Sequence, residues 1–391
     1  MYGLWHEVDG KKVCCNPWTH FEISNPNGNV AMCPWRHGLV LGNVNDQSID
    51  EIWNGEKYQE ARMDMLKLGA ETFCTSSCGV LLGLYKERSL SWYEELSQDT
   101  ECYKNALENE AEFEQQKTVL TTKPRWMRFC PSYKCNYECY HCYQGNDREL
   151  KLKLPDHVLT QILEGMEYYQ VFLVFGGEPT IQPEFKKIFT AGEEYNYIRY
   201  SILTNGSQLH KIIDDIQRVT WLSFDVSLDA ATPESYLALR KSDNWLQILE
   251  NLKTVQTLRQ TKSFKFGIGM TLNRVNHGEI YKFFILGQSL NAIPSYTLVV
   301  NPDKGADFDQ KYLDFTAEEI ASVVAQINRI ETEFPEQFKV TTLQTIRRIM
   351  FGYRKHRLQA YLHEKTKLLH KLGQFLPKRL KYAAKKLLVG S

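Results

Sequence analysis

Three cysteines in one short stretch of this chain could bind a metal group together. They are Cys135, Cys139 and Cys142, in a C-x3-C-x2-C spacing. Three thiolates on one loop can bind three irons of a cubane iron–sulfur cluster and leave the fourth iron open to a small molecule. Cysteines at short spacing can also bind zinc, although zinc sites usually combine paired C-x2-C units with a fourth ligand. The loop alone leaves that choice open.

Three further motifs follow this loop, and each ends an apolar, strand-like run. They are FGGEP over 175–179, ILTNG over 202–206 and VSLDA over 226–230. Together with the cysteine spacing, their order resembles the radical S-adenosylmethionine (radical SAM) superfamily over roughly residues 123–305. The resemblance implies an enzyme that reductively cleaves S-adenosylmethionine to a 5′-deoxyadenosyl radical, which then abstracts hydrogen from a substrate C–H bond. An iron–sulfur electron carrier or scaffold is the non-catalytic alternative, and the complete motif series argues against it.

The same resemblance implies a role for each motif residue. The three loop cysteines would bind the cluster, and Gly176, Gly177 and Glu178 would approach the amino group of S-adenosylmethionine. The remaining cofactor contacts would be Asn205, Ser227 and Asp229 to the ribose, Arg240 or Lys241 to the carboxylate, and His141 beside the adenine. Cys130 ends the first strand, so its thiol could return a hydrogen atom to a substrate radical. The alternative is that Cys130 is a small buried residue.

The first eighty residues carry a second set of cysteines, Cys14, Cys33, Cys74 and Cys78. The surrounding pieces resemble a SPASM or twitch domain, the auxiliary-cluster module of many radical SAM enzymes: C-x-x-P-W, a Gly-x4-Cys turn, LGNV, EIW and a closing cysteine pair. The resemblance implies a second 4Fe–4S cluster on these thiols, with Cys15 as the alternative to Cys14. A zinc knuckle is the other interpretation. Two features depart from the family: the module precedes the core, and its cysteines suffice for one auxiliary cluster only.

Strand-like and helical segments alternate from about residue 125 to 300, which predicts an α/β fold with a parallel sheet. Six such units resemble the partial (β/α)6 barrel of radical SAM enzymes, in which ligands bind at the carboxyl ends of the strands. The sequence therefore predicts four parts: an auxiliary 4Fe–4S domain over 1–84, a helical linker over 85–122, the radical SAM core over 123–305 and a helical, basic region over 306–391.

Composition and charge indicate the compartment and the classes of partner expected for this protein. The 391 residues carry a net charge of zero, which argues against a nucleic-acid partner. Neither an export signal nor a membrane-spanning apolar run is evident, and ten cysteines without a secretory signal indicate a reducing, cytoplasmic compartment. The basic residues after about 347 favour a solvated helical face; an anionic leader peptide, a lipid-linked substrate or a membrane surface is a less favoured partner.

One-core enzymes with a SPASM module commonly modify ribosomally made peptides, so the resemblance implies cross-linking, epimerisation or excision in a peptide. Oxidation or epimerisation of a sugar or another small metabolite is the alternative. A flavodoxin or ferredoxin would donate electrons. No leader-binding winged-helix pattern is evident in the sequence, so any leader-binding domain is expected on a separate protein.

Overall fold

The computed structural model of this chain describes residues 5–34, 38–74, 78, 81, 96–142, 144, 152–298 and 315–351. The chain forms two compact units. One contains residues 1–270 and 285–294, and the other contains 271–284 and 295–391.

A mixed sheet is the framework of the first unit. Among the described residues it has nine strands in the order β11-β10-β9-β8-β7-β6-β3-β4-β5. The pairs from β3 through β6, β7, β8 and β9 to β10 are parallel, whereas β4 is antiparallel to both β3 and β5. The strands are β3 (His20–Ile23), β4 (Asn29–Ala31), β5 (Gly42–Asn43), β6 (Trp126–Phe129), β7 (Val171–Val174), β8 (Arg199–Thr204), β9 (Thr220–Ser227), β10 (Lys265–Leu272) and β11 (Ile293–Leu298).

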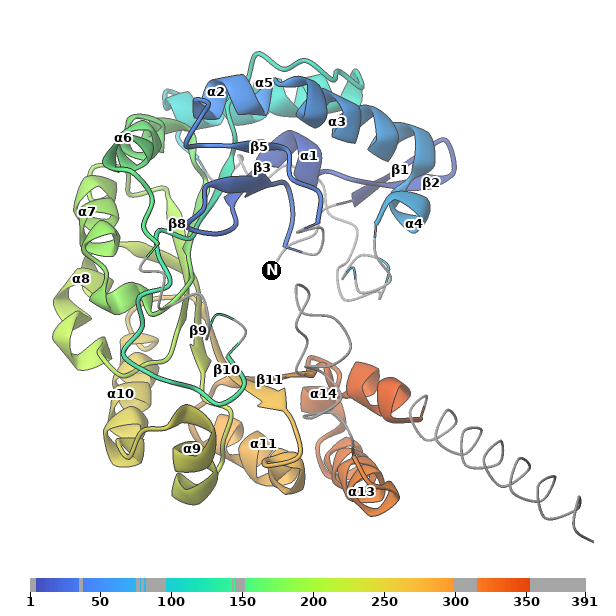
Figure 1. Cartoon of the computed structure of the whole chain (residues 1–391), viewed down its shortest axis with the longest axis vertical. Helices are drawn as coiled ribbons and strands as arrows, with labels where there is room; N and C mark the ends of the chain where they lie inside the picture. Colours follow the sequence, from blue (N-terminus) through green and yellow to red (C-terminus); the bar gives the residue numbers. More distant parts are fainter. Residues whose placement is uncertain are drawn as a thin grey trace, which may run out of the picture. The chain divides into compact units, whose positions relative to one another are not determined.

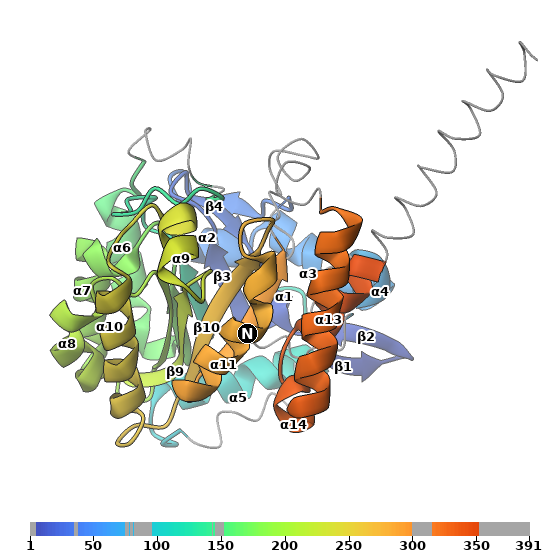
Figure 2. The same ribbon diagram turned by 90° about the horizontal axis from the view of Figure 1, so that it is seen from below.

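Helices follow the parallel strands and cover one face of the sheet (Figures 1 and 2). On that face, Phe189 packs against Tyr200 and Trp221 with ring centroids 4.8 and 5.4 Å apart. Because side chains alternate along a strand, the neighbours of Tyr200 in β8 point to the opposite face, which we call the inner face. A register shift after Trp221 brings Ser223 of β9 opposite Ser201 on that face. The helices are α6 (Asp156–Glu164), α7 (Pro183–Gly192), α8 (Ile213–Arg218), α9 (Pro233–Arg240), α10 (Trp245–Leu258) and α11 (Ile280–Ser289).

The alternation of strands and helices confirms the predicted α/β class. Proline and capping residues mark where helices begin in this sequence. At α9, for example, Thr232 accepts a hydrogen bond from Ser235 N at 3.3 Å and so caps the helix. The last strand begins at Ile293, and a 3-10 turn over Leu209–Lys211 precedes α8. Closure of six units into a partial barrel stays a prediction.

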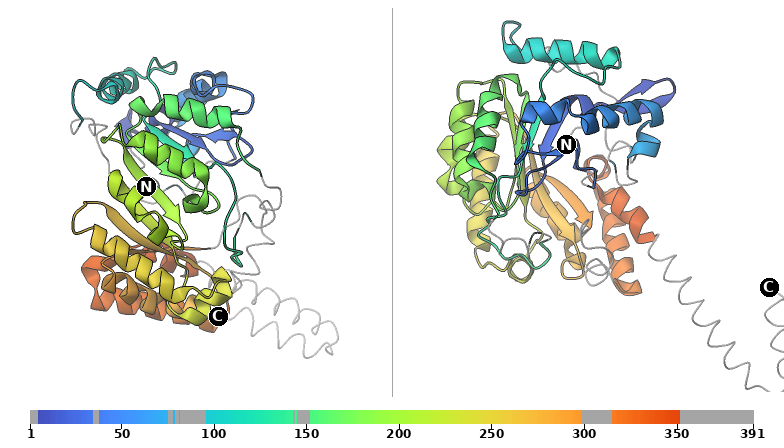
Figure 3. Two further views of the ribbon diagram at one scale, coloured as in Figure 1. Left: turned by 90° about the vertical axis from the view of Figure 1, so that its left-hand side faces the viewer. Right: turned by 45° about the horizontal axis from the view of Figure 1, so that its top comes forward.

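The N-terminal segment joins this sheet directly. Strand β3 pairs with β6 in parallel register, from His20 opposite Trp126 to Ile23 opposite Phe129. A separate hairpin, β1 (Trp5–Val8) with β2 (Lys11–Cys14), precedes it. The helices here are α1 (Asn16–Thr19), α2 (Ile49–Trp53), α3 (Glu56–Leu68), α4 (Ala70–Phe73) and α5 (Glu101–Glu114) (Figure 3). The sequence did not predict that β3 extends the sheet of the core.

One buried arginine ties the pieces of this N-terminal region together. Arg62 of α3 has no exposed surface, and its guanidinium donates hydrogen bonds to the carbonyls of Pro17 at 2.9 Å, Trp53 at 2.8 Å and Thr118 at 2.7 Å. Burial lowers its pKa to about 10. These bonds satisfy carbonyls from three separate segments with one side chain.

The second unit contains the helices α13 (Ala317–Glu333) and α14 (Pro335–Phe338). Thr316 and Glu319 form a capping box at the start of α13. Among the described residues, no helix has the length and apolar character needed to cross a bilayer. The basic residues from 352 onward, on which the predicted leader, lipid or membrane contacts depend, lie outside the described part of the chain.

Candidate metal and cofactor site

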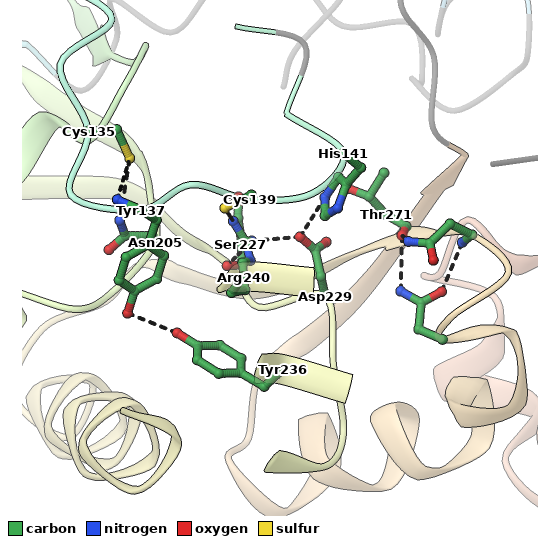
Figure 4. A network of polar contacts seen from close by, with 12 residues as sticks. Cys135, Tyr137, Cys139, His141, Asn205, Ser227, Asp229, Tyr236, Arg240 and Thr271 are labelled. Atoms are coloured by element: carbon green, nitrogen blue, oxygen red, sulfur yellow. Dashed lines mark hydrogen bonds and ion pairs between the residues drawn. The ribbon is translucent and has the colours of Figure 1, made fainter. Parts of the chain in front are cut away.

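The three loop cysteines follow β6 on an irregular loop with a turn at 140–141, and all three side chains are half-buried. Hydrogen-bond donors lie next to two of the sulfurs. The backbone amide of Tyr137 and the side-chain amide of Asn205 donate to Cys135 Sγ at 3.4 and 3.9 Å (Figure 4). The guanidinium of Arg240 donates to Cys139 Sγ at 3.4 Å. Donors that face sulfur suit thiolates, so this loop fits a cluster held by Cys135, Cys139 and Cys142.

Two helices of the unit fix the position of this loop. The amide of Tyr140 donates to the carbonyl of Leu239 in α9 at 2.8 Å. The Tyr137 hydroxyl lies 3.0 Å from that of Tyr236 in α9 and donates to Asn244 Oδ1, before α10, at 2.7 Å. The loop is therefore anchored on both sides of Cys139.

The two glycines after β7 form a turn that packs against the start of the loop. Gly176 and Gly177 have φ of 87° and 53°, a region that favours glycine. A Cβ on Gly176 would collide with Cys130 Sγ, and one on Gly177 would collide with the Lys134 carbonyl. The sequence predicted that a cofactor approaches these glycines closely. In the structure, the Cys130 side chain and the Lys134 backbone are the groups that lie close to them. Cofactor contact by these glycines stays a prediction.

The Glu178 carboxylate links β7 to the end of β8. It has no exposed surface and accepts hydrogen bonds from Thr204 Oγ1 at 2.6 Å and from Asn205 N at 2.6 Å. Burial raises its pKa, although these hydrogen bonds and those from Thr180 act in the opposite direction. Glu178 thus fixes Asn205 beside Cys135, and its predicted contact with an amino group stays untested.

Asp229 is the centre of the charged part of the site. Its φ of 62° is unusual for a residue other than glycine. Its carboxylate lies 2.9 Å from His141 Nε2 and 2.8 Å from Arg240 Nη2, and Arg240 also contacts the carbonyl of Ser227. The residues predicted to contact ribose, carboxylate and adenine therefore contact one another and the cluster loop (Figure 4). Their roles toward a cofactor stay predictions.

The four N-terminal thiols lie near enough to influence one another, and their joint binding of a cluster stays a prediction. Burial, and then repulsion from Cys33 and Cys78, raise the pKa of Cys14, and a hydrogen bond with Cys78 contributes most to the raised pKa of Cys74. Cys15 instead lies near Arg125 and Glu110, which favours Cys14 as the ligand. Thiols that influence one another in this way suit the binding of an auxiliary cluster. Among the residues that the structure describes, no three His, Cys, Asp or Glu side chains are grouped as ligands of a single metal ion.

Cys130 lies beneath the glycine turn with no exposed surface, and burial raises the pKa of its thiol. Hydrogen transfer from this thiol to a substrate would require the Gly176 turn to move. Its catalytic role stays a prediction, and the packing around it agrees with the alternative of a small buried residue.

The sequence analysis missed a row of side chains on the inner face. Glu22, Arg128, Leu173, Ser201 and Ser223 are consecutive partners across five strands. Glu22 pairs with Arg128 at 3.1 Å, and the hydroxyls of Ser201 and Ser223 lie 3.1 Å apart.

One residue further along the same face, Leu203 is 49% exposed beside Asp225. Asp225 in turn occupies the space that a Cβ on Gly267 would need. The alternation of Ser223, Asp225 and Ser227 along β9 is the signal that could have identified this face in the sequence.

Comparison with known families matches the two regions separately. A sequence model of the radical SAM superfamily matches residues 129–284, and one of an iron–sulfur cluster-binding domain, SPASM, matches residues 14–79. These matches assign S-adenosylmethionine and iron–sulfur chemistry to the chain.

Individual relatives are distant. A probable GTP 3′,8-cyclase of Saccharolobus islandicus is 22% identical over 179 residues, which is 45% of this chain and 57% of that protein. A mycofactocin maturase, MftC, of Mycobacterium ulcerans is 23% identical over 193 residues, 49% of this chain and 51% of that protein. The chain thus spans about half the length of these curated relatives. The Streptococcus suis SuiB structure has 16% identity and a TM-score of 0.44, covering 59% of this chain and 51% of SuiB.

Proposed function

Because this chain is a radical SAM enzyme with an N-terminal SPASM domain, we propose that it modifies a ribosomally synthesised peptide by abstracting hydrogen from a C–H bond. S-adenosylmethionine on a reduced cluster supplies the hydrogen-abstracting chemistry. Cys135, Cys139 and Cys142 would hold that 4Fe–4S cluster, and Cys14, Cys33, Cys74 and Cys78 would hold an auxiliary 4Fe–4S cluster.

The observation that carries this proposal is the continuous sheet. Strand β3, which lies between Cys14 and Cys33 in the chain, pairs in register with β6, which leads into the cluster loop. The two cysteine sets are therefore parts of one compact unit. Forming a cross-link in a peptide removes a second electron from the substrate after hydrogen abstraction. An auxiliary cluster in the same unit would give that electron an acceptor, so cross-linking is the reaction that this arrangement favours over epimerisation.

The inner face supplies surroundings that suit a peptide. Leu203 offers exposed apolar surface, and the neighbouring Asp225 carboxylate can accept a hydrogen bond from an N–H group. An amino-acid residue carries both an apolar side chain and an amide N–H, so it could contact Leu203 and Asp225 together. The MftC relative, whose name describes a maturase, agrees with this substrate class.

Oxidation or rearrangement of a small metabolite is the second candidate. The relatives named as probable GTP 3′,8-cyclases match the chain over 179 residues, nearly the same length as the maturase match of 193 residues. The polar row around Ser201 and Ser223 would equally suit hydroxyl groups of a sugar.

Deuterium transfer separates the two candidates. The reconstituted full chain is incubated without oxygen with S-adenosylmethionine, dithionite and one labelled probe: perdeuterated synthetic peptides encoded by neighbouring genes, deuterated GTP or a deuterated sugar nucleotide. We expect deuterium in 5′-deoxyadenosine only with a peptide. Transfer from GTP or the sugar nucleotide alone would establish the second candidate and refute the first. A flavodoxin or ferredoxin should replace dithionite, and a separate leader-binding protein should raise the rate with the peptide.

A further inference from the structure

Arg240 connects a cluster cysteine to the end of β9. Its side chain lies at the end of α9 with 7% of the residue exposed. One guanidinium nitrogen donates to Cys139 Sγ at 3.4 Å, and the other lies 2.8 Å from an Asp229 oxygen and contacts the Ser227 carbonyl. Both terminal nitrogens of the guanidinium therefore contact the chain (Figure 4), whereas Nε is buried without a hydrogen-bond partner among the described residues.

Asn205 provides a second donor to the loop with an equally fixed direction. Its Oδ1 accepts a hydrogen bond from Ser207 N at 2.9 Å. The amide nitrogen is thereby turned toward Asn136 Oδ1 at 3.0 Å and Cys135 Sγ at 3.9 Å. Two of the three loop thiols thus have a polar side chain held against them from outside the loop.

We propose that Arg240 and Asp229 act as a pair that sets the reduction potential of the cluster through Cys139, and that Arg240 does not bind the carboxylate of S-adenosylmethionine. This inference rests on the proposed binding of a 4Fe–4S cluster by the loop. A reduced cluster is more negative than an oxidised one, so a hydrogen-bond donor and a positive charge at its thiolate stabilise the reduced form. The Asp229 carboxylate offsets part of that charge.

The two members of the pair must therefore shift the potential in opposite directions. Replacing Arg240 with glutamine removes the charge and should lower the potential. Replacing Asp229 with asparagine removes the opposing charge and should raise it. Asparagine also tolerates the left-handed backbone conformation at this position, so the fold should survive.

The experiment is a redox titration of reconstituted full-length protein followed by electron paramagnetic resonance. The signal of the loop cluster is the one missing from the Cys135, Cys139 and Cys142 triple alanine variant. Arg218→Gln is the matched control, because Arg218 is 49% exposed and pairs with Glu193 at 2.9 Å. This substitution removes the same charge from an arginine that makes no sulfur contact within the described part of the chain. Its potential should stay close to that of the unaltered protein, and Arg240→Lys, which keeps the charge, should shift less than Arg240→Gln.

Binding of S-adenosylmethionine, measured by equilibrium dialysis, completes the test. We expect Arg240→Gln to change the affinity less than twofold. An unchanged potential together with a tenfold loss of affinity would overturn the inference in favour of carboxylate binding. Potentials that move in the same direction for R240Q and D229N would also overturn it. If the loop binds no cluster at all, the proposed function fails together with the inference, whereas a cluster with an unchanged potential refutes the inference alone.

Discussion

The two cysteine sets of this protein are held in contrasting ways. The loop thiols are half-buried on an irregular loop, and polar side chains just after β8 and at the end of α9 donate hydrogen bonds to two of them. Of the N-terminal thiols, Cys14, Cys33 and Cys78 are buried, and Cys14 receives the hydrogen bond of a backbone amide, that of Asn16. Structural metal sites are closed, whereas a site that binds a small molecule keeps a coordination position open. We therefore expect that removing the loop cysteines abolishes cleavage of S-adenosylmethionine, and that removing the N-terminal cysteines lowers the stability of the fold.

Removing the ligands of each set separately should have the largest effect. The unaltered protein should bind about eight irons in two cubane clusters. Replacing Cys135, Cys139 and Cys142 with alanine should remove about half of this iron and abolish cleavage of S-adenosylmethionine, with little change in thermal stability. Replacing Cys14 and Cys33 should also remove about half, but should lower the unfolding temperature. Iron analysis and calorimetry would contradict the two-cluster assignment if either variant lost all its iron, or if the N-terminal set bound zinc.

A larger side chain at the Gly176–Gly177 turn should disturb the loop cysteines and leave the N-terminal cysteines unchanged. Gly177→Val places a side chain against the Lys134 carbonyl at a φ of 53°, so the turn or the loop must move. We expect cleavage of S-adenosylmethionine without substrate to fall by about 100-fold or more, the loss expected when reacting groups are misplaced by about 1 Å. Gly38→Ala is the control, since a Cβ there meets no atom within 4 Å. Equal cleavage by the two variants would show that the GGEP assignment is wrong.

The stability of the N-terminal region should depend on Arg62 rather than on its surface ion pairs. Arg62→Leu removes the guanidinium donor from three carbonyls, two of them in buried contacts, and we expect a loss of about 3 kcal/mol or more in the free energy of unfolding. The control Arg218→Leu removes an exposed pair with Glu193 and should cost less than about 1 kcal/mol. Denaturant unfolding measures both. Similar losses for the two variants would contradict the central role of Arg62.

The sequence predicted the chemistry-bearing residues better than their partners. Cys135, Gly176 and Asp229 each follow a strand. The ends of these strands can be predicted from the nearby sequence, because apolar residues mark the strands and prolines mark the starts of the helices that follow. The joining of β3 to β6 could not be predicted, because β-pairing between segments about 100 residues apart depends on long-range packing rather than local pattern. The contact of Arg240 with Cys139 was missed for the same reason. The resemblance suggested a cofactor partner for Arg240, but the geometry of helix α9 decides which atoms the guanidinium reaches.

The smallest predicted effect concerns Asp225 of β9, which belongs to neither cysteine set and lies on the inner face of the sheet. If a substrate N–H donates to this carboxylate, Asp225→Asn keeps the size but weakens the acceptor. Hydrogen bonds to a charged partner contribute about 1.5–3 kcal/mol, so kcat/KM for deuterium transfer from the peptide should fall roughly 10- to 100-fold. Cleavage of S-adenosylmethionine without substrate should change much less, because that reaction needs no substrate contact. Asp156→Asn, at an 85% exposed side chain, is the matched control. If D225N reduces both reactions equally, Asp225 supports the fold of the core and does not contact the substrate.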